Sequence, residues 1–385
     1  MKAVCFSSYN KSPNKVLEVK TIPKPFIDKC KPNDSDQDRD RDQVQDPVQK
    51  QQQVLIKVHA CALNPLDKIR LNGDLAMILP EQFDTENVLG YDLSGVIEEV
   101  SYSFETGTGT GDGDGNFKVG DEVFVRLAPG SNGIKYGALA EYVVCNVVDV
   151  GRKPKNISFE EAAAIPLSGL AAFQCLLRGG VKEGSKVFIP GGAGGVGSLA
   201  IQIAKKVFKA GHVCTTAGPG KGTALCHRMG ADRVINYKEE DFEITLKGED
   251  FDMVLDTMNE ASKMGGLLKP GVGKVISISG PPTVEAIEDI MDGRPVPFVV
   301  KAFMWLTRNR KAERAAKHAD GSWEYLSTRS SGKELNELAS YLESGEIKAV
   351  IDAEGNASGL DDFMTAVDKL WSGRSKGKCV IKVVE

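Results

Sequence analysis

The stretch Val187-Phe-Ile-Pro-Gly-Gly-Ala-Gly-Gly-Val-Gly-Ser-Leu-Ala-Ile-Gln-Ile-Ala-Lys-Lys-Val-Phe-Lys-Ala210 decides the fold of this chain. Its pattern predicts a buried strand, a glycine-rich turn and an amphipathic helix. The turn contains the spacing Gly-x-Gly-x-x-Gly at Gly192, Gly194 and Gly197. In such a turn the glycines allow a tight bend, a close approach of the backbone to a pyrophosphate, and close packing of the helix on the strand. The stretch therefore predicts the phosphate-binding turn of a dinucleotide site.

Strands and helices alternate on both sides of this turn, from about residue 156 onward. Such alternation favours a parallel, doubly wound α/β sheet of the Rossmann type. The expected elements are helices at 159–177, 196–209 and 332–344, and strands at 186–190, 212–217, 233–237, 252–257 and 275–279. The turn lies after a strand and before a helix within this region, which is the context that a dinucleotide fingerprint requires.

Residues 1–150 have a different sequence pattern. Short β-type runs are separated by turn residues, which is typical of an all-β unit. Two hydrophilic stretches in this unit, at about 30–53 and 105–116, are too polar to pack and are expected to be solvated insertions. The last segment, 348–385, is expected to return to the first unit. This division leaves 151–347 as the dinucleotide-binding domain.

The overall composition excludes several classes of protein. The formal net charge is −5, so no global field favours nucleic acid or an anionic membrane as a partner. The eight cysteines contain no Cys-x-x-Cys pair, which indicates reduced thiols in a cytoplasmic protein. The chain begins with a strand-like run instead of a targeting segment, and it has no apolar run long enough to span a membrane.

The residues after the second strand of the alternating region bear on the choice of cofactor. NAD-selective sites place an Asp or Glu about 20 residues past the glycine turn, where it binds the ribose 2′-hydroxyl. Here the strand ends in Cys214-Thr-Thr-Ala-Gly-Pro-Gly-Lys221, which has no acid and adds a lysine. An ammonium attracts a 2′-phosphate, so NADPH is the expected cofactor. The alternative is that Lys221 is only an exposed loop lysine.

Several further motifs carry a resemblance to a known family. They are Ala62-Leu-Asn-Pro-Leu-Asp67, Val88-Leu-Gly-Tyr-Asp-Leu-Ser-Gly-Val-Ile97, Gly120-Asp-Glu-Val-Phe124, Glu161-Ala-Ala-Ala-Ile-Pro-Leu-Ser-Gly-Leu170 and Gly230-Ala-Asp-Arg-Val-Ile-Asn-Tyr237. With the glycine turn, they make the chain resemble the medium-chain dehydrogenase/reductase superfamily. The nearest resemblance is to its zinc-free branch of quinone oxidoreductases and enone reductases, which includes the reticulon-4-interacting-protein type. The resemblance implies a GroES-like β-rich catalytic domain beside the Rossmann domain.

The resemblance also implies that this chain lacks catalytic zinc. Zinc-dependent members of the superfamily bind the metal with a Cys, a His and a second Cys, and the corresponding positions here are Asn64, Tyr91 and Leu167. A leucine cannot bind zinc, which takes Cys, His or carboxylate ligands. We therefore expect no metal site.

Without zinc to polarise an alcohol, the reaction most compatible with the site is hydride transfer to an electron-poor acceptor. A quinone or an α,β-unsaturated carbonyl fits, because its oxygen then needs only hydrogen-bond donors. By the resemblance, Asn64 lies near the nicotinamide and is the candidate donor. An asparagine before proline is also a common turn former, and this interpretation is compatible with the first.

Two further residues are catalytic candidates. Enone reductases of this branch often have a lysine five residues after the asparagine, whereas Lys68 follows Asn64 by four. Such a shift changes the face on a strand but not necessarily on a turn or helix, so the role of Lys68 stays open. Tyr91 either lines the pocket and donates a proton or only packs there.

The resemblance assigns the remaining cofactor contacts. It places Thr216, Lys221 and Tyr237 around the 2′-phosphate, with a sheet-edge aromatic as the alternative for Tyr237. It places Ser168, Ser279 and Gly280 near the pyrophosphate and the nicotinamide. The residues of the turn that are expected to contact the cofactor are Gly192, Ala193, Gly194, Gly195, Val196 and Gly197.

The sequence leaves the acceptor open among a quinone, an enone and an enoyl thioester, and a non-catalytic NADPH-binding scaffold is the alternative from another class. Residues 281–326 contain an apolar run and are expected to line the pocket for a small hydrophobic carbonyl or quinone substrate, or to form a homodimer contact. The basic segment 308–314 is interpreted as a solvated helix face.

Overall fold

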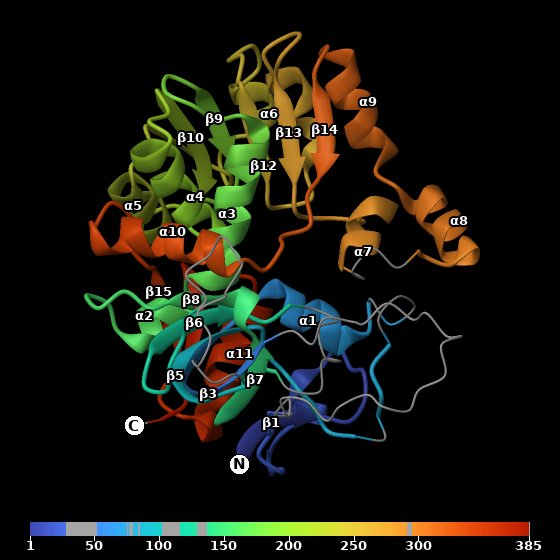
Figure 1. Ribbon diagram of the computed structural model, residues 1–385. Coiled ribbons are helices and arrows are strands. Elements are labelled where there is room, and N and C mark those ends of the chain that lie inside the picture. The colour runs from blue at the N-terminus through green and yellow to red at the C-terminus, as the bar shows by residue number, and fades with distance from the viewer. Residues whose placement is uncertain are drawn as a thin grey trace, which may run out of the picture.

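The structure is a computed structural model that describes residues 1–27, 52–74, 76, 80–83, 85–101, 116–128, 137–290 and 295–384. Apart from their outermost residues, the two hydrophilic insertions lie outside these ranges. The described residues form a β-rich unit that carries both termini and a second unit built on a parallel sheet, as Figure 1 shows.

The β-rich unit is built on a seven-stranded sheet with the order β15-β16-β3-β5-β6-β8, in which β7 also pairs with β3. Its strands are β3 (Gln53–Leu63), β5 (Asp92–Val100), β6 (Glu122–Arg126), β7 (Tyr142–Asn146), β8 (Val150–Arg152), β15 (Ile351–Ala357) and β16 (Lys378–Lys382). A smaller sheet joins β2 (Leu17–Thr21), β1 (Lys2–Phe6) and β4 (Asn87–Val88). Apolar residues of both ends of the chain share one core.

Within residues 1–150 the structure adds an α-helix to the expected strands, and a second α-helix, from the last segment of the chain, also packs in this β-rich unit. Helix α1 (Pro65–Asn72) follows β3 directly, and α11 (Phe363–Trp371) packs on β15 and β16. Helix α1 begins at a capping box in which Asn64 and Asp67 exchange side-chain and backbone hydrogen bonds, with proline at the first helical position. It ends at Gly73, whose φ of 79° is the left-handed conformation that glycine adopts without strain.

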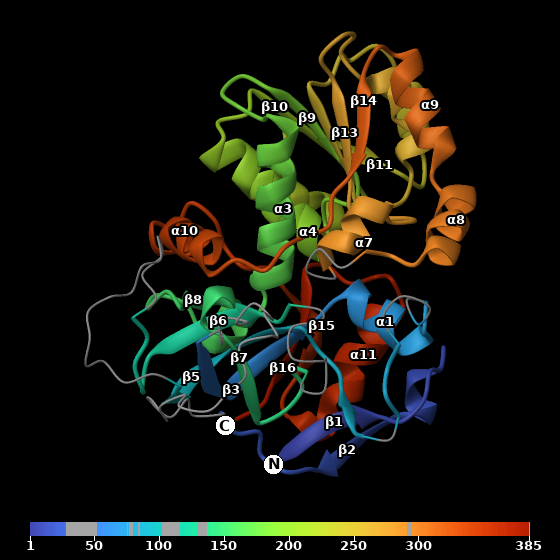
Figure 2. The same ribbon diagram turned by 45° about the vertical axis from the view of Figure 1, so that its right-hand side comes forward.

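The second unit is a six-stranded sheet with the order β11-β10-β9-β12-β13-β14, in which every neighbouring pair is parallel. The strands are β9 (Lys186–Ile189), β10 (His212–Ala217), β11 (Arg233–Asn236), β12 (Met253–Asp256), β13 (Lys274–Ser277) and β14 (Ser322–Tyr325). Figure 2 shows helices on both faces of this sheet. Val187 and Ile189 of β9 belong to one apolar cluster and Phe188 to another, so the sheet is buried on both faces. The expected α/β Rossmann domain is confirmed.

The helices of this unit are α3 (Pro166–Gly179), α4 (Gly195–Gln202), α5 (Lys221–Met229), α6 (Phe242–Thr245), α7 (Val284–Ile290), α8 (Phe298–Thr307), α9 (Arg310–His318) and α10 (Gly332–Glu343). The single helix expected over 159–177 is instead two, α2 (Phe159–Ala163) and α3. Proline at 166 supplies no N–H, so it ends the first hydrogen-bond ladder and stands at the start of the next. After α4 the helix continues as a π-helical turn over Ile203–Val207.

The end of the chain connects the two units. Strand β16 pairs antiparallel with β3, so that Cys379 lies opposite Leu63. Immediately before this strand, Gly377 donates its N–H to the carbonyl of Ala193, at 2.8 Å, and forms a bridge with Gly194. The last strand of the β-rich unit therefore starts beside the glycine-rich turn of the other unit.

Candidate active site

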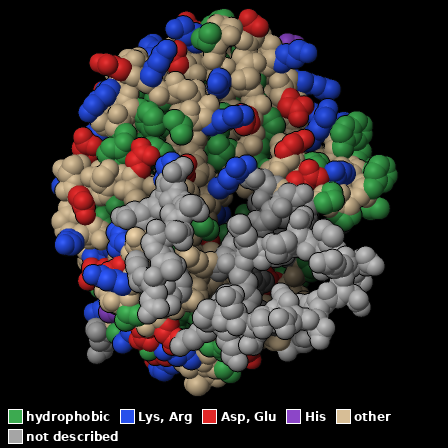
Figure 3. All heavy atoms as spheres, viewed as in Figure 1, with side chains coloured by type: hydrophobic (Ala, Val, Ile, Leu, Met, Phe, Trp, Pro, Cys, Tyr) green, Lys and Arg blue, Asp and Glu red, His purple; other side chains and the backbone are tan. Residues whose placement is uncertain are grey.

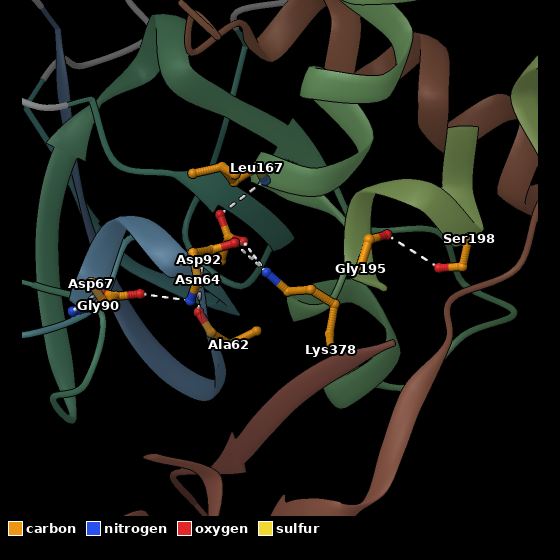
Figure 4. Close-up of polar contacts among 9 residues, drawn as sticks. All are labelled: Ala62, Asn64, Asp67, Gly90, Asp92, Leu167, Gly195, Ser198 and Lys378. Carbon is orange, nitrogen blue, oxygen red and sulfur yellow. Dashed lines mark hydrogen bonds and ion pairs between the residues drawn. The ribbon is translucent and has the colours of Figure 1, made fainter. Parts of the chain in front are cut away.

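The candidate site is a buried polar group at the junction of the two units, shown in Figure 4. Asn64 follows β3, Asp92 is the first residue of β5, and Lys378 is the first residue of β16. Their side chains point toward one another, and all three residues are at least 96% buried. Strand pairing brings them together, because β3 lies between β5 and β16 in the sheet.

Asp92 is the centre of this group. Its Oδ2 accepts hydrogen bonds from Asn64 Nδ2 at 3.0 Å and from Lys378 Nζ at 3.1 Å, while its Oδ1 accepts from the backbone N–H of Leu167 at 2.9 Å. Leu167 lies in the first turn of α3, where the positive end of the helix dipole favours a carboxylate. The carboxylate therefore has a cation and two neutral donors in compensation for its loss of water.

The orientation of the Asn64 amide follows from its two charged neighbours. Lys378 donates to Oδ1 of Asn64, and Asp92 accepts from its Nδ2. The second Nδ2 hydrogen has only a contact of 3.4 Å to the carbonyl of Ala62, at the long limit of a hydrogen bond. A strong acceptor placed in the site could take this hydrogen. Asn64 is also the N-cap of α1, so the turn-forming interpretation holds beside the donor prediction.

Asp67 connects the N-terminus of α1 to the loop between β4 and β5. Its Oδ2 accepts from the backbone N–H of Asn64 at 2.7 Å and its Oδ1 from that of Gly90 at 2.9 Å. Burial raises the pKa of Asp67 to about 7, although the hydrogen bond from Asn64 lowers it. Asp67 therefore changes protonation near neutral pH in the folded protein.

The other two catalytic candidates lie outside this hydrogen-bonded group. Lys68 is half-buried on α1 and donates to the carbonyl of Trp371, at 3.4 Å, at the C-terminal end of α11. Tyr91 is 97% buried, which raises the pKa of its hydroxyl above the ordinary value, and Arg70 lies 5.9 Å from its ring centre. The catalytic roles of both residues stay predictions.

The glycine-rich turn approaches the polar group from the other unit. A Cβ at Gly195 would lie 2.9 Å from Cδ of Lys378 and 3.1 Å from Oγ of Ser168, so a larger residue here would have to displace these side chains. A Cβ at Gly197 would lie 2.3 Å from the carbonyl oxygen of Gly191, which means that helix α4 starts directly against the turn. At Gly194, by contrast, only that carbonyl oxygen lies within 4 Å, at 3.3 Å. The backbone N–H groups at the start of α4 suit a phosphate group.

Thr216 is the second-last residue of β10, Lys221 follows that strand, and Tyr237 comes directly after β11. The hydroxyl of Thr216 accepts from the N–H of Gly191 at 3.0 Å, which attaches the strand end to the turn. Lys221 is exposed at the first position of α5, and Tyr237 is 60% exposed with its hydroxyl beside Gly218. The lysine and the phenol are thus accessible to a ligand at the edge where a Rossmann fold binds its cofactor.

The remaining predicted contacts also lie at this edge. Ser168 is 98% buried in the first turn of α3. Ser279 follows β13 and donates its hydroxyl to the carbonyl of Thr257, at 3.1 Å. Gly280 has a φ of 90°, and a side chain there would collide with Asn259. Ala193 accepts from Gly377, and Val196 lies in the first turn of α4.

The sequence prediction missed Asp92 and Lys378. The signal for Asp92 was an ionisable residue at the start of an apolar strand, next to Tyr91 in a motif already singled out. The signal for Lys378 was a lysine directly before the apolar run Cys379-Val-Ile381. Buried ionisable residues are rare unless they are paired. Each position therefore predicts a charged partner, but the sequence does not show which residue that partner is.

A search of the described residues finds no group of three or more His, Cys, Asp or Glu side chains that could hold a metal. The three positions that correspond to zinc ligands in the resemblance are occupied by an amide, a phenol and an alkyl side chain. In the part of the chain that the structure describes, no helix combines the length and the apolar character that crossing a membrane requires.

Comparison with known proteins identifies the family. Residues 50–155 match the alcohol dehydrogenase GroES-like domain, and residues 229–381 match the zinc-binding dehydrogenase family. A 2-methylene-furan-3-one reductase of Solanum lycopersicum is 36% identical over 87% of this chain and 73% of its own length. An NADPH-dependent alkenal/one oxidoreductase of Arabidopsis thaliana, described as chloroplastic, is 33% identical over 80% of this chain and 67% of its own length.

A solved structure supports the same assignment. The quinone oxidoreductase from Coxiella burnetii is 29% identical, with a TM-score of 0.72 over 100% of this chain and 99% of that chain. Fold and relatives together define an oxidoreductase with a GroES-like β-rich unit and a Rossmann-like unit. The chain belongs to the medium-chain dehydrogenase/reductase superfamily, and its relatives include quinone and enone reductases and proteins of the reticulon-4-interacting type, as the sequence motifs indicated.

Proposed function

We propose that this protein is an NADPH-dependent, zinc-independent reductase of quinones or α,β-unsaturated carbonyls. The observation that carries the proposal is the buried Asn64, Asp92 and Lys378 group, which lies beside Gly195 of the glycine-rich turn. An amide donor fixed next to a hydride source suits a substrate whose oxygen gains charge as hydride arrives at carbon. The enone, alkenal and quinone relatives support this class of substrate.

The residues of the cofactor region fit NADPH. A Cβ at Gly194 would meet only the carbonyl oxygen of Gly191 within 4 Å, and no side chain caps the N-terminus of α4, which suits a pyrophosphate. We propose that Thr216, Lys221 and Tyr237 bind the 2′-phosphate, and that Ser168, Ser279 and Gly280 contact the nicotinamide end. When bound, NADPH supplies the hydride.

The protein's own part in the reaction is to position and stabilise the substrate oxygen. Asp92 and Lys378 hold the Asn64 amide in one orientation and leave one Nδ2 hydrogen for that oxygen. Burial of the group strengthens this hydrogen bond, because little water competes for it. Asn64 is therefore the proposed donor, and Lys378 acts as a positioning residue.

Zinc independence is supported by the chemistry of the same residues. The ammonium of Lys378 lies within hydrogen-bond distance of both Asn64 and Asp92, where it would repel a metal cation. Leu167 offers the site only its backbone N–H, which is a donor. We expect dialysis against a chelator to leave turnover unchanged, whereas a loss of turnover that only Zn²⁺ restores would contradict this part of the proposal.

Steady-state oxidation of NADPH with a panel of quinones, enones and enoyl thioesters tests the reaction. We expect turnover with quinones or enones, and the Asn64→Ala variant should lower kcat while NADPH affinity stays unchanged. Binding of NADPH without turnover of any acceptor would refute the enzymatic proposal.

Cofactor choice has its own test. Lys221→Ala should raise the KM for NADPH roughly 10-fold, because a charge-assisted contact to the phosphate is lost, and should leave the KM for NADH unchanged. Lys182→Ala, at another exposed lysine, is the matched control. An equal change for both cofactors would assign Lys221 a structural role.

We further propose that residues 1–150 and 348–385 form the catalytic domain and 151–347 the NADPH-binding domain. The pairing of β16 with β3 supports this division. Expression of residues 151–347 as a separate chain tests the domain division.

We also propose a cytoplasmic location, since the seven cysteines in the described ranges are all free and buried, as in a reducing compartment. Cell fractionation tests the location.

A further inference from the structure

Helix α8 turns a broad apolar face away from the rest of the protein. The exposed fractions are 85% for Phe298, 74% for Val299, 51% for Phe303, 55% for Trp305 and 66% for Leu306. At the 3.6 residues per turn of an α-helix, these side chains and the exposed Ala302 occupy one continuous arc of roughly 160°. Figure 3 shows apolar side chains gathered at this edge of the molecule. Exposed apolar patches of this kind mark interaction sites.

The opposite face of the helix is anchored. Met304 is buried in a small cluster with Ile287 of α7 and Val296, and Val300 packs against the same cluster. This packing determines which side of α8 faces outward. In both ribbon views α8 lies at the outer edge of the dinucleotide-binding unit, beside α7 and α9.

Basic side chains surround the apolar face. Six lysines and arginines and a single acidic residue lie between residues 301 and 317. The guanidinium groups of Arg308 and Arg310 lie 5.6 and 4.3 Å from the ring centre of Trp305. Two of the basic residues are in ion pairs, Lys301 with Glu288 of α7 and Arg308 with Glu313, and the other four leave a local positive excess in a chain whose formal net charge is −5.

Helix α9 extends the basic region. Its inner face is buried through Ala312 and Ala316, which belong to the core of the unit. On its outer face Lys311, Arg314 and Lys317 are exposed, and they form no ion pair with any residue in the described ranges. Their charge is therefore available to an anionic partner.

We propose that α8 and the outer face of α9 dock this protein on the surface of an anionic lipid membrane. A helix that presents Phe, Trp and Leu beside Lys and Arg is the pattern of an interfacial anchor, in which the apolar face enters the headgroup region and the basic residues contact anionic lipids. Trp305 between two arginines suits that boundary, where aromatic rings accumulate. With 10 residues, α8 is too short to span a bilayer.

A second copy of this chain fits the same face less well. A two-fold contact through α8 would bring the basic regions of both copies into or beside one interface. Like charges held together in this way oppose association, whereas an anionic bilayer compensates them. The homodimer contact expected for residues 281–326 is thus the competing occupant that the experiment must exclude.

Co-sedimentation of the full-length chain with phosphatidylcholine vesicles, with and without phosphatidylserine, tests the proposal. We expect binding only to the vesicles with phosphatidylserine, together with a blue shift of tryptophan fluorescence that is lost in Trp305→Phe. The indole nitrogens of Trp323 and Trp371 are already buried, so Trp305 should dominate the shift.

Two double variants separate the contributions. Lys311→Glu/Arg314→Glu should lower the fraction bound at least about tenfold, because each basic residue near an anionic surface contributes severalfold to partitioning. Phe303→Ser/Leu306→Ser should reduce binding to a similar extent. The control Lys155→Glu/Lys333→Glu changes the net charge equally and should bind like the wild type. Lys333 is an exposed lysine of α10 and Lys155 is an exposed lysine just before α2, and Figure 1 shows both helices on the side of the molecule away from α8.

Equal binding to neutral vesicles, or unchanged binding in both double variants, would overturn the proposal. Sedimentation equilibrium of the lipid-free protein measures its oligomeric state and so tests whether a second copy occupies the α8 face. A dimer that dissociates in Phe303→Ser/Leu306→Ser, without any vesicle binding by the wild type, would assign the face to a second copy. Because NADPH turnover is measured separately, these results do not depend on the proposed reaction.

Discussion

At the scale of single residues, the main feature of the site is the ion pair of Asp92 and Lys378, which the fold buries almost completely. A buried pair is worth little compared with apolar packing, but loss of one partner leaves an uncompensated charge. The pair persists here because each member has a further task. Asp92 caps the start of α3, and Lys378 orients the Asn64 amide.

Replacement of the lysine alone should therefore be costly. We expect Lys378→Met to lower the free energy of unfolding by about 3–5 kcal/mol in urea titrations, because Asp92 loses its cation. Asp92→Asn in the same chain should recover part of this loss. Lys378→Arg should retain a larger share of the wild-type kcat than Lys378→Met does. A purely structural role of the lysine would not require this difference. Lys382→Met, at the far end of β16, is the control, and an equal loss there would contradict the argument.

Asp67 should make stability depend on pH in a defined window. Its pKa is raised from 3.8 to about 7 in the folded protein, so the folded state binds more protons than the unfolded state between about pH 4 and pH 7. The contribution of this group to stability is present below about pH 4 and is lost as the pH rises through 7, by an amount of the order of 4 kcal/mol.

The measurement is the free energy of unfolding of the wild type and of Asp67→Asn across this range. The wild type should lose stability relative to Asp67→Asn as the pH rises. A constant difference between the two proteins would show that Asp67 titrates alike in the folded and unfolded states.

At the scale of elements, the glycine-rich turn is where sequence and structure agree best. Strand β9, the turn and α4 occur in the predicted order, since a glycine pattern between apolar runs is a local signal. Other elements depended on context. Asn64 before Pro65 is compatible with a turn, and only the structure shows that it is the N-cap of α1. The helix expected at 159–177 breaks at Pro166, because proline has no N–H to continue the first helix.

Gly197→Ala tests the close approach of α4 to the turn. The added Cβ would lie 2.3 Å from the carbonyl oxygen of Gly191, so the backbone must move. We expect stability to fall by about 1–3 kcal/mol and the Kd for NADPH, measured by fluorescence titration, to rise about tenfold or more. Gly266→Ala, where nothing lies within 4 Å, is the control. Unchanged NADPH affinity in Gly197→Ala would mean that the turn does not hold the cofactor.

At the scale of the whole molecule, the two units are joined through the site itself. Asp92 of the β-rich unit binds the N-terminus of α3, and Gly377 binds the glycine-rich turn. A ligand held by the turn therefore acts on contacts of both units.

Cofactor binding should accordingly stabilise the full chain and discriminate between dinucleotides. At about 100 times its Kd, NADPH should add about 2.7 kcal/mol to the free energy of unfolding and raise the melting temperature in a thermal shift experiment. NADH at the same concentration should have a smaller effect, because it lacks the phosphate that Lys221 is proposed to bind. Equal shifts with both dinucleotides would contradict the assignment of NADPH.

The sequence by itself determined the Rossmann turn, the alternation that follows it, the missing acid after the second strand and the family, because each of these is a pattern of spacing along the chain. Only the tertiary structure decided which charges meet. Asp92 and Lys378 are 286 residues apart and become neighbours because β3 pairs with both β5 and β16. Strand order depends on long-range packing, which no local pattern encodes. The exposed face of α8 has the same origin, since an apolar helix predicts burial until its neighbours are known.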